Sequence, residues 1–495
     1  MTVRIQGFGP IASGDVCLKP LTVFIGPNNS GKSYAAMLLN SLFAAHGPLW
    51  PSSRRPYRRA SALETMVMEP SGPDLAKRLG KALEHAQPGD VAAIPPDLIT
   101  AYVDEAFRRT YGARMTAELT RSFSARPCDL TSIHQDAFHL SLEPHGVCEP
   151  TNLSCADDSV SVDARPNVPL TVLCEMLASP GTAGIGYSTS PDGSQITVRV
   201  PGVGRELRHR IVVVDDMLRD LVSSRCENTC WYPLLRPCFY LPAARSGILQ
   251  AHRALAAGIV ETARYVGIEK HPEVPALSGV VADFISSILQ LSPDHRGPFF
   301  AMAGDFERRL TQGEIRLDTA GLYVYPDIKY HFQGETIPLH RASSTVSEAA
   351  PLFLYLKYLV REDSVLIVEE PEAHLHPANQ RILARLLVSL VRKGLRLIIT
   401  THSDYLLEQL GNFVMLSGVA TDARADIHGY GRDEYLQPDE VGVHLFRRSG
   451  NGDHVIERVA VSEEEGIPLD EFVRVGEELY DEGVRIVRDR QKRSQ

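Results

Sequence analysis

Apolar residues in this chain form short unbroken runs, separated by longer segments with helical spacing. Such runs are typical of strands buried on both faces of a sheet, and the spacing between them favours strand–helix–strand units with parallel strands. The runs expected to form strands are 3–5, 21–25, 239–242, 364–368 and 395–400. The segments expected to form helices are 32–45, 248–265, 275–291, 346–361 and 377–393, with a strand meander at 313–338.

The middle of the chain has a different character. It begins with a connector rich in proline and arginine (Arg54, Arg55, Pro56, Arg58, Arg59), continues with helical stretches at 74–85 and 97–122, and becomes strand-prone at 135–214. We therefore expect an α/β fold with a mixed sheet, interrupted by a large α+β insertion. The expected parts are a head made from 1–47 and 238–460, an insertion at 48–237, and a charged helical tail at 461–495.

Composition excludes several classes of protein. The chain has 495 residues, 44% of them hydrophobic and 23% charged, with a formal net charge of -10. This balance is ordinary for a globular protein and gives no support to a strongly basic nucleic-acid-coating protein. No signal peptide is visible at residues 1–12, and no apolar stretch reaches the roughly 18 residues of a membrane span, so we expect a cytoplasmic protein without a membrane partner.

Cysteines give only a weak signal. Eight cysteines in so long a chain are too few for a disulfide framework. Cys226, Cys230 and Cys238 could be read as zinc ligands, but no tight fourth ligand follows. Ordinary reduced thiols are the preferred interpretation.

The first motif with chemical meaning follows the apolar run at 21–25. It has the pattern G-x4-G-K-[ST], and the residues expected to bind a nucleotide are Gly26, Pro27, Asn28, Asn29, Ser30, Gly31, Lys32, Ser33 and the adjoining Tyr34. Glycines let the backbone N–H groups surround phosphate oxygens, and the helix that follows directs its positive end at the same anion. Lys32 then serves the β- and γ-phosphates of ATP, and the Ser33 hydroxyl suits Mg²⁺.

The second motif follows the strand expected at 364–368. Glu369 and Glu370 open the sequence E-E-P-E-A-H-L-H-P, at the end of a strand where α/β sheets place their ligands. We expect Glu369 to hold the Mg²⁺ shell and Glu370 to act as general base on the attacking water. A plain acidic surface turn is the alternative, and the presence of a P-loop in the same chain disfavours it.

The third motif is T-T-H-S-D at 400–404, at the end of the next expected strand. Its His402 could contact the γ-phosphate of ATP. A lone histidine at such a place is more often an ordinary loop residue with satisfied hydrogen bonds, but its order and spacing after the two earlier motifs favour contact with the γ-phosphate.

Together these motifs resemble the ABC-type ATPase heads of the SMC/RecF and OLD families, above all the OLD-like or RecF-like bacterial AAA proteins. The resemblance covers about 1–45 and 238–460, including F-Y-L-P-A-A-R-S-G at 239–247. It implies that Glu369 is the acidic Walker B residue, Glu370 the catalytic glutamate and His402 the switch histidine. It also implies a homodimer or higher homo-oligomer, in which each ATP lies between one subunit's P-loop and the other's signature motif.

The candidate signature is A-S-S-T-V-S-E at 342–348, with Ser344, Ser347 and Glu348 as nucleotide-contacting candidates. Its serines at a helix start suit phosphate contact. It lacks the glycines of the usual Ser-Gly-Gly pattern, and a capping box completed by Glu348 would explain the same residues. The segment lies just before the helix expected at 346–361, which leads to the strand that carries Glu369, and this position favours the signature interpretation. For the Q-loop glutamine, Gln135 and Gln195 are available, but neither can be assigned.

Three functional classes compete. The resemblance favours the ATPase of an anti-phage defence system, with a separate nuclease or toxin as effector, because the metal-binding elements of a TOPRIM nuclease are not visible after His402. The alternative is a DNA-repair ATPase of RecF type. DNA binding is possible for it, although the arginines at 54–59 are read first as a solvated connector. A transporter ATPase is disfavoured by the long insertion and by the missing Leu-Ser-Gly-Gly signature.

Overall fold

The computed structural model divides into two compact units. Unit 1 comprises Met1–Phe8, Ser41–Arg121 and Ala125–Arg236, and unit 2 comprises Gly9–Asn40, Ser122–Ser124 and Pro237–Gln495. The structure describes residues 1–45, 73–84, 87, 89–106, 111–143, 150–163, 171–177, 186–190, 195–201, 215, 234, 236–251, 277–318, 327–424, 426, 429–449 and 452–493.

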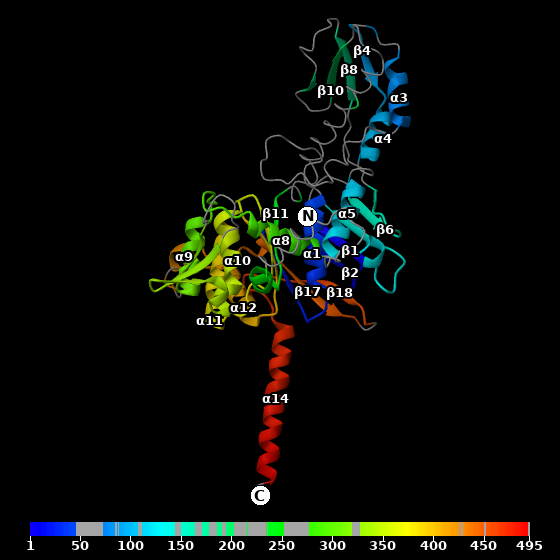
Figure 1. Cartoon of the computed structure of the whole chain (residues 1–495). Helices are drawn as coiled ribbons and strands as arrows, with labels where there is room; N and C mark the ends of the chain where they lie inside the picture. The colour runs from blue at the N-terminus through cyan, green and yellow to red at the C-terminus, as the bar shows by residue number, and fades with distance from the viewer. Residues whose placement is uncertain are drawn as a thin grey trace, which may run out of the picture. The chain divides into compact units, whose positions relative to one another are not determined.

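Unit 2 contains a mixed sheet with the strand order β11-β15-β16-β3-β17-β18-β2. Figure 1 labels β11, β17, β18 and β2 among these strands. The five strands from β11 to β17 are parallel to their neighbours, whereas β18 runs antiparallel to β17. The strands are β2 (Ile11–Cys17), β3 (Leu21–Ile25), β11 (Cys238–Leu241), β15 (Val365–Glu369), β16 (Arg396–Thr400), β17 (Val441–Arg448) and β18 (His454–Val459). The predicted α/β fold with a mixed sheet is confirmed.

The helices of this unit are α8 (Gly279–Leu289), α9 (Phe300–Thr311), α10 (Ser344–Tyr358), α11 (Pro377–Arg392), α12 (Asp404–Met415), α13 (Thr421–Arg424) and α14 (Asp470–Arg493), and α1 (Lys32–Ala45) begins in it. Single 3₁₀ turns lie at Leu339–Arg341, Leu416–Gly418 and Pro438–Glu440. The predicted meander is present as β12 (Glu314–Asp318), β13 (Asp327–Phe332) and β14 (Glu335–Pro338).

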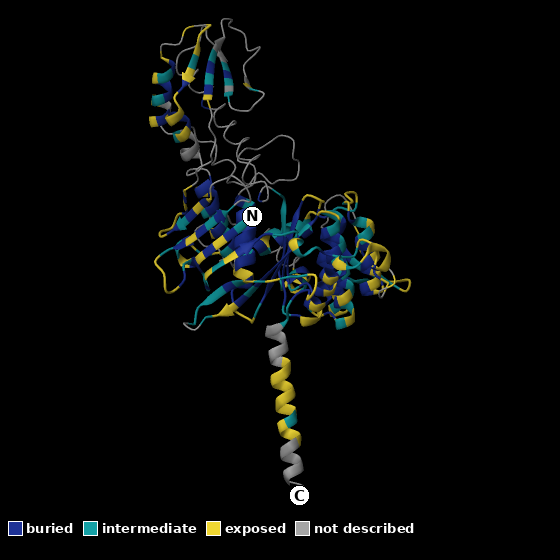
Figure 2. Cartoon of the chain, turned by 180° about the vertical axis from the view of Figure 1, so that it is seen from behind, coloured by how far each residue is buried: buried dark blue, intermediate teal, exposed yellow. Residues whose placement is uncertain are grey.

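The core of unit 2 explains why the apolar runs become strands. Every residue of β3 and of β15 is buried, as expected for strands covered on both faces. Helices α9, α10, α11 and α12 contribute their buried faces to the same hydrophobic cluster (Figure 2). Each fully buried Leu, Val or Phe contributes roughly 1.5–3 kcal/mol, so the central strands are held firmly in place.

Unit 1 contains two groups of strands. Strands β1 (Thr2–Phe8), β5 (Phe138–Glu143), β6 (Thr151–Cys155) and β7 (Ser161–Asp163) pair antiparallel in that order. A separate four-stranded sheet has the order β4-β8-β10-β9. Its strands are β4 (Val91–Ile94), β8 (Thr171–Leu177), β9 (Gly186–Thr189) and β10 (Gln195–Pro201), with α3 (Pro73–Leu83) and α4 (Pro96–Ala106) packed against it. Helix α5 (Ala113–Phe123) begins in this unit, and a 3₁₀ turn (Pro127–Leu130) lies in it.

The domain boundaries expected at 47 and 237 stay predictions. Unit 2 resumes at Pro237, while the contacts group strand β1 with the middle of the chain because β1 pairs with β5. The arginines at 54–59, the cysteines 226 and 230, and most of the helix expected at 248–265 lie outside the described residues. No helix in the parts of the chain that the structure describes is long and apolar enough to cross a membrane.

Candidate nucleotide-binding site

Three neighbouring strands bring the predicted motifs together. In the sheet, β16 lies between β15 and β3, and all three run in the same direction. The register places Glu369 beside Thr400 and Thr400 beside Phe24. The residues that follow these strands therefore meet at one edge of the sheet, where parallel α/β folds bind their ligands.

The P-loop after β3 depends on its glycines. Gly26 has φ 135°, and a Cβ there would lie 2.2 Å from the carbonyl oxygen of Phe446. Gly31 has φ 99°, in the left-handed region that side chains avoid. Asn29 also lies in that region, and the Ser30 hydroxyl donates a hydrogen bond of 2.8 Å to the carbonyl of Pro27. This backbone has the conformation expected of the anion-binding loop that the sequence predicts, and phosphate binding by it stays a prediction.

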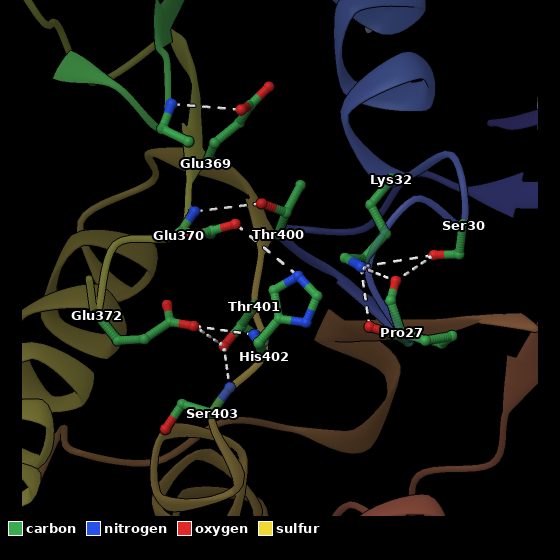
Figure 3. Close-up of polar contacts among 12 residues, drawn as sticks. Pro27, Ser30, Lys32, Glu369, Glu370, Glu372, Thr400, Thr401, His402 and Ser403 are labelled. Atoms are coloured by element: carbon green, nitrogen blue, oxygen red, sulfur yellow. Dashed lines mark hydrogen bonds and ion pairs between the residues drawn. The ribbon is translucent and has the colours of Figure 1, made fainter. Parts of the chain in front are cut away.

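Lys32 fills the centre of that loop (Figure 3). Its Nζ donates to the carbonyl of Gly26 at 2.8 Å and to that of Pro27 at 2.6 Å. Burial lowers the pKa of Lys32 to about 8, although Glu370 and Glu372 favour the charged form. Since carbonyls are weak partners for a buried ammonium, a phosphate would be a better one, and the Lys32 charge is available to bind it.

Glu369 is buried and bonded at both carboxylate oxygens. Its Oε1 accepts from the Tyr240 hydroxyl and its Oε2 from the backbone N–H of Ala243 at 3.2 Å. Ser33 also donates a side-chain hydrogen bond to this carboxylate, while burial raises the pKa of Glu369. A hydroxyl and a carboxylate in contact at the P-loop suit a hard cation such as Mg²⁺.

Glu370 differs from Glu369 in both backbone and exposure. Its φ of 43° lies in the left-handed region, which is costly for a side chain other than glycine. Its N–H donates to the carbonyl of Thr400 at 3.0 Å, and 43% of its side chain is exposed. The Glu370 carboxylate can therefore reach a water molecule, as a general base must.

His402 lies opposite Glu370, with its Nε2 3.8 Å from Oε1 of Glu370. This distance is too long for a hydrogen bond. Burial, and secondly the nearby Lys32 charge, lower the pKa of His402, and Glu370 acts in the opposite direction. The imidazole is thus mainly uncharged at neutral pH and can donate a hydrogen bond to a ligand placed between the two strand ends.

Glu372 was missed by the sequence reasoning. Its buried Oε1 accepts from the Thr401 hydroxyl at 2.5 Å and from the His402 N–H at 2.9 Å (Figure 3). Burial raises the pKa of this carboxyl. Glu372 thereby fixes the turn that carries His402. The only signal in the sequence was a third acidic residue in E-E-P-E.

The candidate signature lies at the start of α10. Ser344 is the exposed first residue of the helix, and the Ser343 hydroxyl caps it by accepting from the Val346 N–H at 3.4 Å. Ser347 is buried and donates to the carbonyl of Leu339 at 3.3 Å. The Glu348 carboxylate is buried against Arg245, so it does not complete the capping box considered from the sequence. The phosphate-contacting role of these residues stays a prediction.

The outer side of the P-loop is open. Pro27, Asn28, Asn29, Ser33 and Tyr34 are all exposed in the single chain. Of the two glutamines considered for a Q-loop, Gln195 begins β10 and Gln135 lies against Gly7, and neither acquires an assigned role.

Residues 299–407 match the family model described as AAA ATPase domain (AAA_15). The matched segment includes Glu369, Glu370 and His402, and the P-loop lies before it. The strand order, the P-loop geometry and this match define the chain as an ATPase of the P-loop class. The prediction of an ATPase is thus confirmed at this level.

Solved structures similar to this chain include SMC heads. An SMC head bound to the C-terminal winged-helix domain of ScpA is 9% identical, with a TM-score of 0.35, over 94% of this chain and 98% of that one. The SMC head domain from Thermotoga maritima is 13% identical, with a TM-score of 0.31, over 93% and 98%. A head with an extended coiled coil from Pyrococcus furiosus is 12% identical, with a TM-score of 0.34, over 97% and 98%. No curated protein matches. At such TM-scores these similarities carry no argument about function.

Proposed function

We propose that this protein binds and hydrolyses Mg²⁺-ATP, and that bound ATP joins two copies of the chain. The observation that carries the proposal is the meeting of the P-loop, Glu369, Glu370 and His402 at the ends of three adjacent parallel strands. The exposed outer residues of the P-loop support the second part, because a nucleotide bound there would be covered by one chain on one side only.

Each side chain has a role that its surroundings suit. Lys32 and the N–H groups of the P-loop bind the phosphates. Ser33 and Glu369 would hold Mg²⁺, which neutralises the charge that develops on the phosphate oxygens. Glu370 accepts a proton from the attacking water, and His402 donates a hydrogen bond to the γ-phosphate. Ser344 of a second copy would complete the site from the open side.

Two substitutions test the catalytic assignment. Lys32→Ala removes the buried ammonium, so we expect loss of ATP binding in a titration with a fluorescent ATP analogue. Glu370→Gln removes the base but not the phosphate contacts, so ATP should still bind while kcat falls by about 100-fold or more. The exposed Glu408 of α12 offers a matched control, since Glu408→Gln should leave both quantities unchanged. Hydrolysis by Glu370→Gln at the native rate would show that Glu370 is not the base.

We further propose that the ATPase cycle controls a separate effector protein, a nuclease or toxin, in anti-phage defence. This finer proposal rests on the resemblance of the motifs to OLD-like proteins. Strands β17 and β18, which follow His402, are strands of the ATPase sheet itself. They are therefore not part of a nuclease domain, and this supports an effector on a separate protein. Co-purification with the product of the neighbouring gene, with and without ATP, tests it. A lone ATPase whose hydrolysis rises with added DNA would favour the repair alternative instead.

A further inference from the structure

Arg245 is the largest fully buried side chain among the described residues, with 2% of it exposed. It belongs to the segment at 239–247, to which the motifs of the candidate site assigned no role. Its Nη1 donates to the carbonyl of Glu369 at 2.6 Å, and its Nη2 donates to the carbonyl of Glu370 at 2.9 Å. One guanidinium therefore holds the backbone of both Walker B glutamates.

The other side of Arg245 faces helix α10. Its Nε lies 3.2 Å from Oε1 of Glu348 and donates to the Glu348 carbonyl at 3.1 Å. Glu348 lies four residues after Ser344, the exposed first residue of α10. Arg245 thus joins the start of the candidate signature helix to the end of β15 within one chain.

Stability alone does not explain this arrangement. Burying a guanidinium and a carboxylate costs free energy that their attraction only partly offsets, and apolar residues of similar size are often as stable. What the arginine supplies is geometry, because its planar fork reaches two adjacent carbonyls at once. The Glu370 carbonyl belongs to a residue at φ 43°, a conformation that persists only where its surroundings hold it.

We propose that Arg245 is a positioning residue for Glu370, and that through Glu348 it makes hydrolysis depend on contact between a second copy and the start of α10. The second half of this statement rests on the proposed ATP-dependent pairing of two copies. The first half needs only hydrolysis by the chain.

The test compares Arg245→Lys with wild type in steady-state hydrolysis and in ATP titration. Lysine keeps the charge but cannot reach both carbonyls. We expect kcat to fall by about tenfold or more, while the Kd for ATP stays within about threefold, because a misplaced base affects the chemical step and not phosphate binding. A kcat within twofold of wild type in the folded variant would overturn the proposal.

Arg424→Lys is the matched control. Arg424 is also a buried arginine of unit 2 whose guanidinium donates to backbone carbonyls, including those of Leu416 and Val419, but these lie in the turns after α12. The Arg424→Lys variant should have a lower melting temperature than wild type and an unchanged kcat. An equal loss of kcat in both variants would show a general structural effect and overturn the positioning role.

Two further variants separate the parts of the proposal. Adding Arg245→Lys to Glu370→Gln should lower kcat no further, since both remove the same function, whereas an additive loss would contradict this.

Glu348→Gln keeps the size of the side chain and removes its charge. It should lower kcat by about threefold or more with the Kd for ATP retained, and it carries the test if Arg245→Lys does not fold.

The same variants distinguish this proposal from the proposed pairing of two copies. If Glu370→Gln forms no ATP-dependent pair, the pairing and the dependence on α10 are both wrong. A selective loss of kcat in Arg245→Lys would then still assign Arg245 to the positioning of Glu370.

Discussion

At the scale of single residues, Glu369, Glu370 and Glu372 lie within four consecutive positions of the chain and have different surroundings. Glu369 is buried and bonded by Tyr240 and Ala243, and Glu372 is buried and bonded by Thr401 and His402. Burial raises the pKa of both carboxyls. Glu370 is the one of the three that is substantially exposed, so it alone is placed to take a proton from water.

His444 gives the fold a dependence on pH that is separate from the site. It is fully buried in β17, its Nε2 lies 3.3 Å from the Cys17 carbonyl, and burial lowers its pKa to about 4. Since the unfolded imidazole titrates near 6.5, acid protonates the unfolded chain first, and the free energy of unfolding falls as pH drops from 6.5 towards 4. This histidine alone should cost about 2 kcal/mol at pH 5.

Denaturant unfolding of wild type and His444→Gln at pH 7 and pH 5 measures this cost. Glutamine can still donate to the Cys17 carbonyl but does not titrate. We expect the difference in free energy of unfolding between the two pH values to be smaller in the variant by about 2 kcal/mol. The same pH dependence in both proteins would mean that His444 titrates normally in the folded state.

At the scale of elements, helix α10 connects an exposed surface to the candidate nucleotide site. Its first residue, Ser344, is exposed, while Ser347 and Glu348 one turn later are buried. A large side chain at position 344 should therefore block a second copy without disturbing the fold of this chain.

We expect Ser344→Arg to keep the Kd for ATP within about threefold and to lower kcat by about tenfold or more, because the substituted residue lies outside the chain's own P-loop. Thr421→Arg, at the exposed first residue of α13, is the matched control and should change neither quantity. Normal hydrolysis by Ser344→Arg would remove α10 from the nucleotide site.

The elements that could be predicted are those with a strong local signal. The apolar run Leu21–Ile25 and the helix Lys32–Ala45 were predicted with the bounds that the structure has. Strand β2 was missed, since Gly14 and Asp15 interrupt its apolar pattern, and α9, α12, β17 and β18 were not predicted either. The motifs could be read from spacing alone. Arg245 could not, because its partners lie more than 100 positions away in the sequence.

At the scale of the whole molecule, the candidate nucleotide site lies entirely in unit 2, although its motifs are spread from Gly26 to His402. Strand β16 brings these distant segments together by pairing with β3 on one side and β15 on the other. The ATPase fold therefore depends on both ends of the chain, and we expect that neither 1–47 nor 238–495 expressed alone binds ATP. ATP titration of each fragment, and of the two mixed, checks this expectation.

The central claim is that ATP bound at this site joins two chains. The most direct measurement is the molar mass of Glu370→Gln by light scattering during gel filtration, with and without Mg²⁺-ATP. We expect a mass near 54.5 kDa without nucleotide and twice that value with ATP. A variant that binds ATP in titration yet keeps the same mass would contradict it.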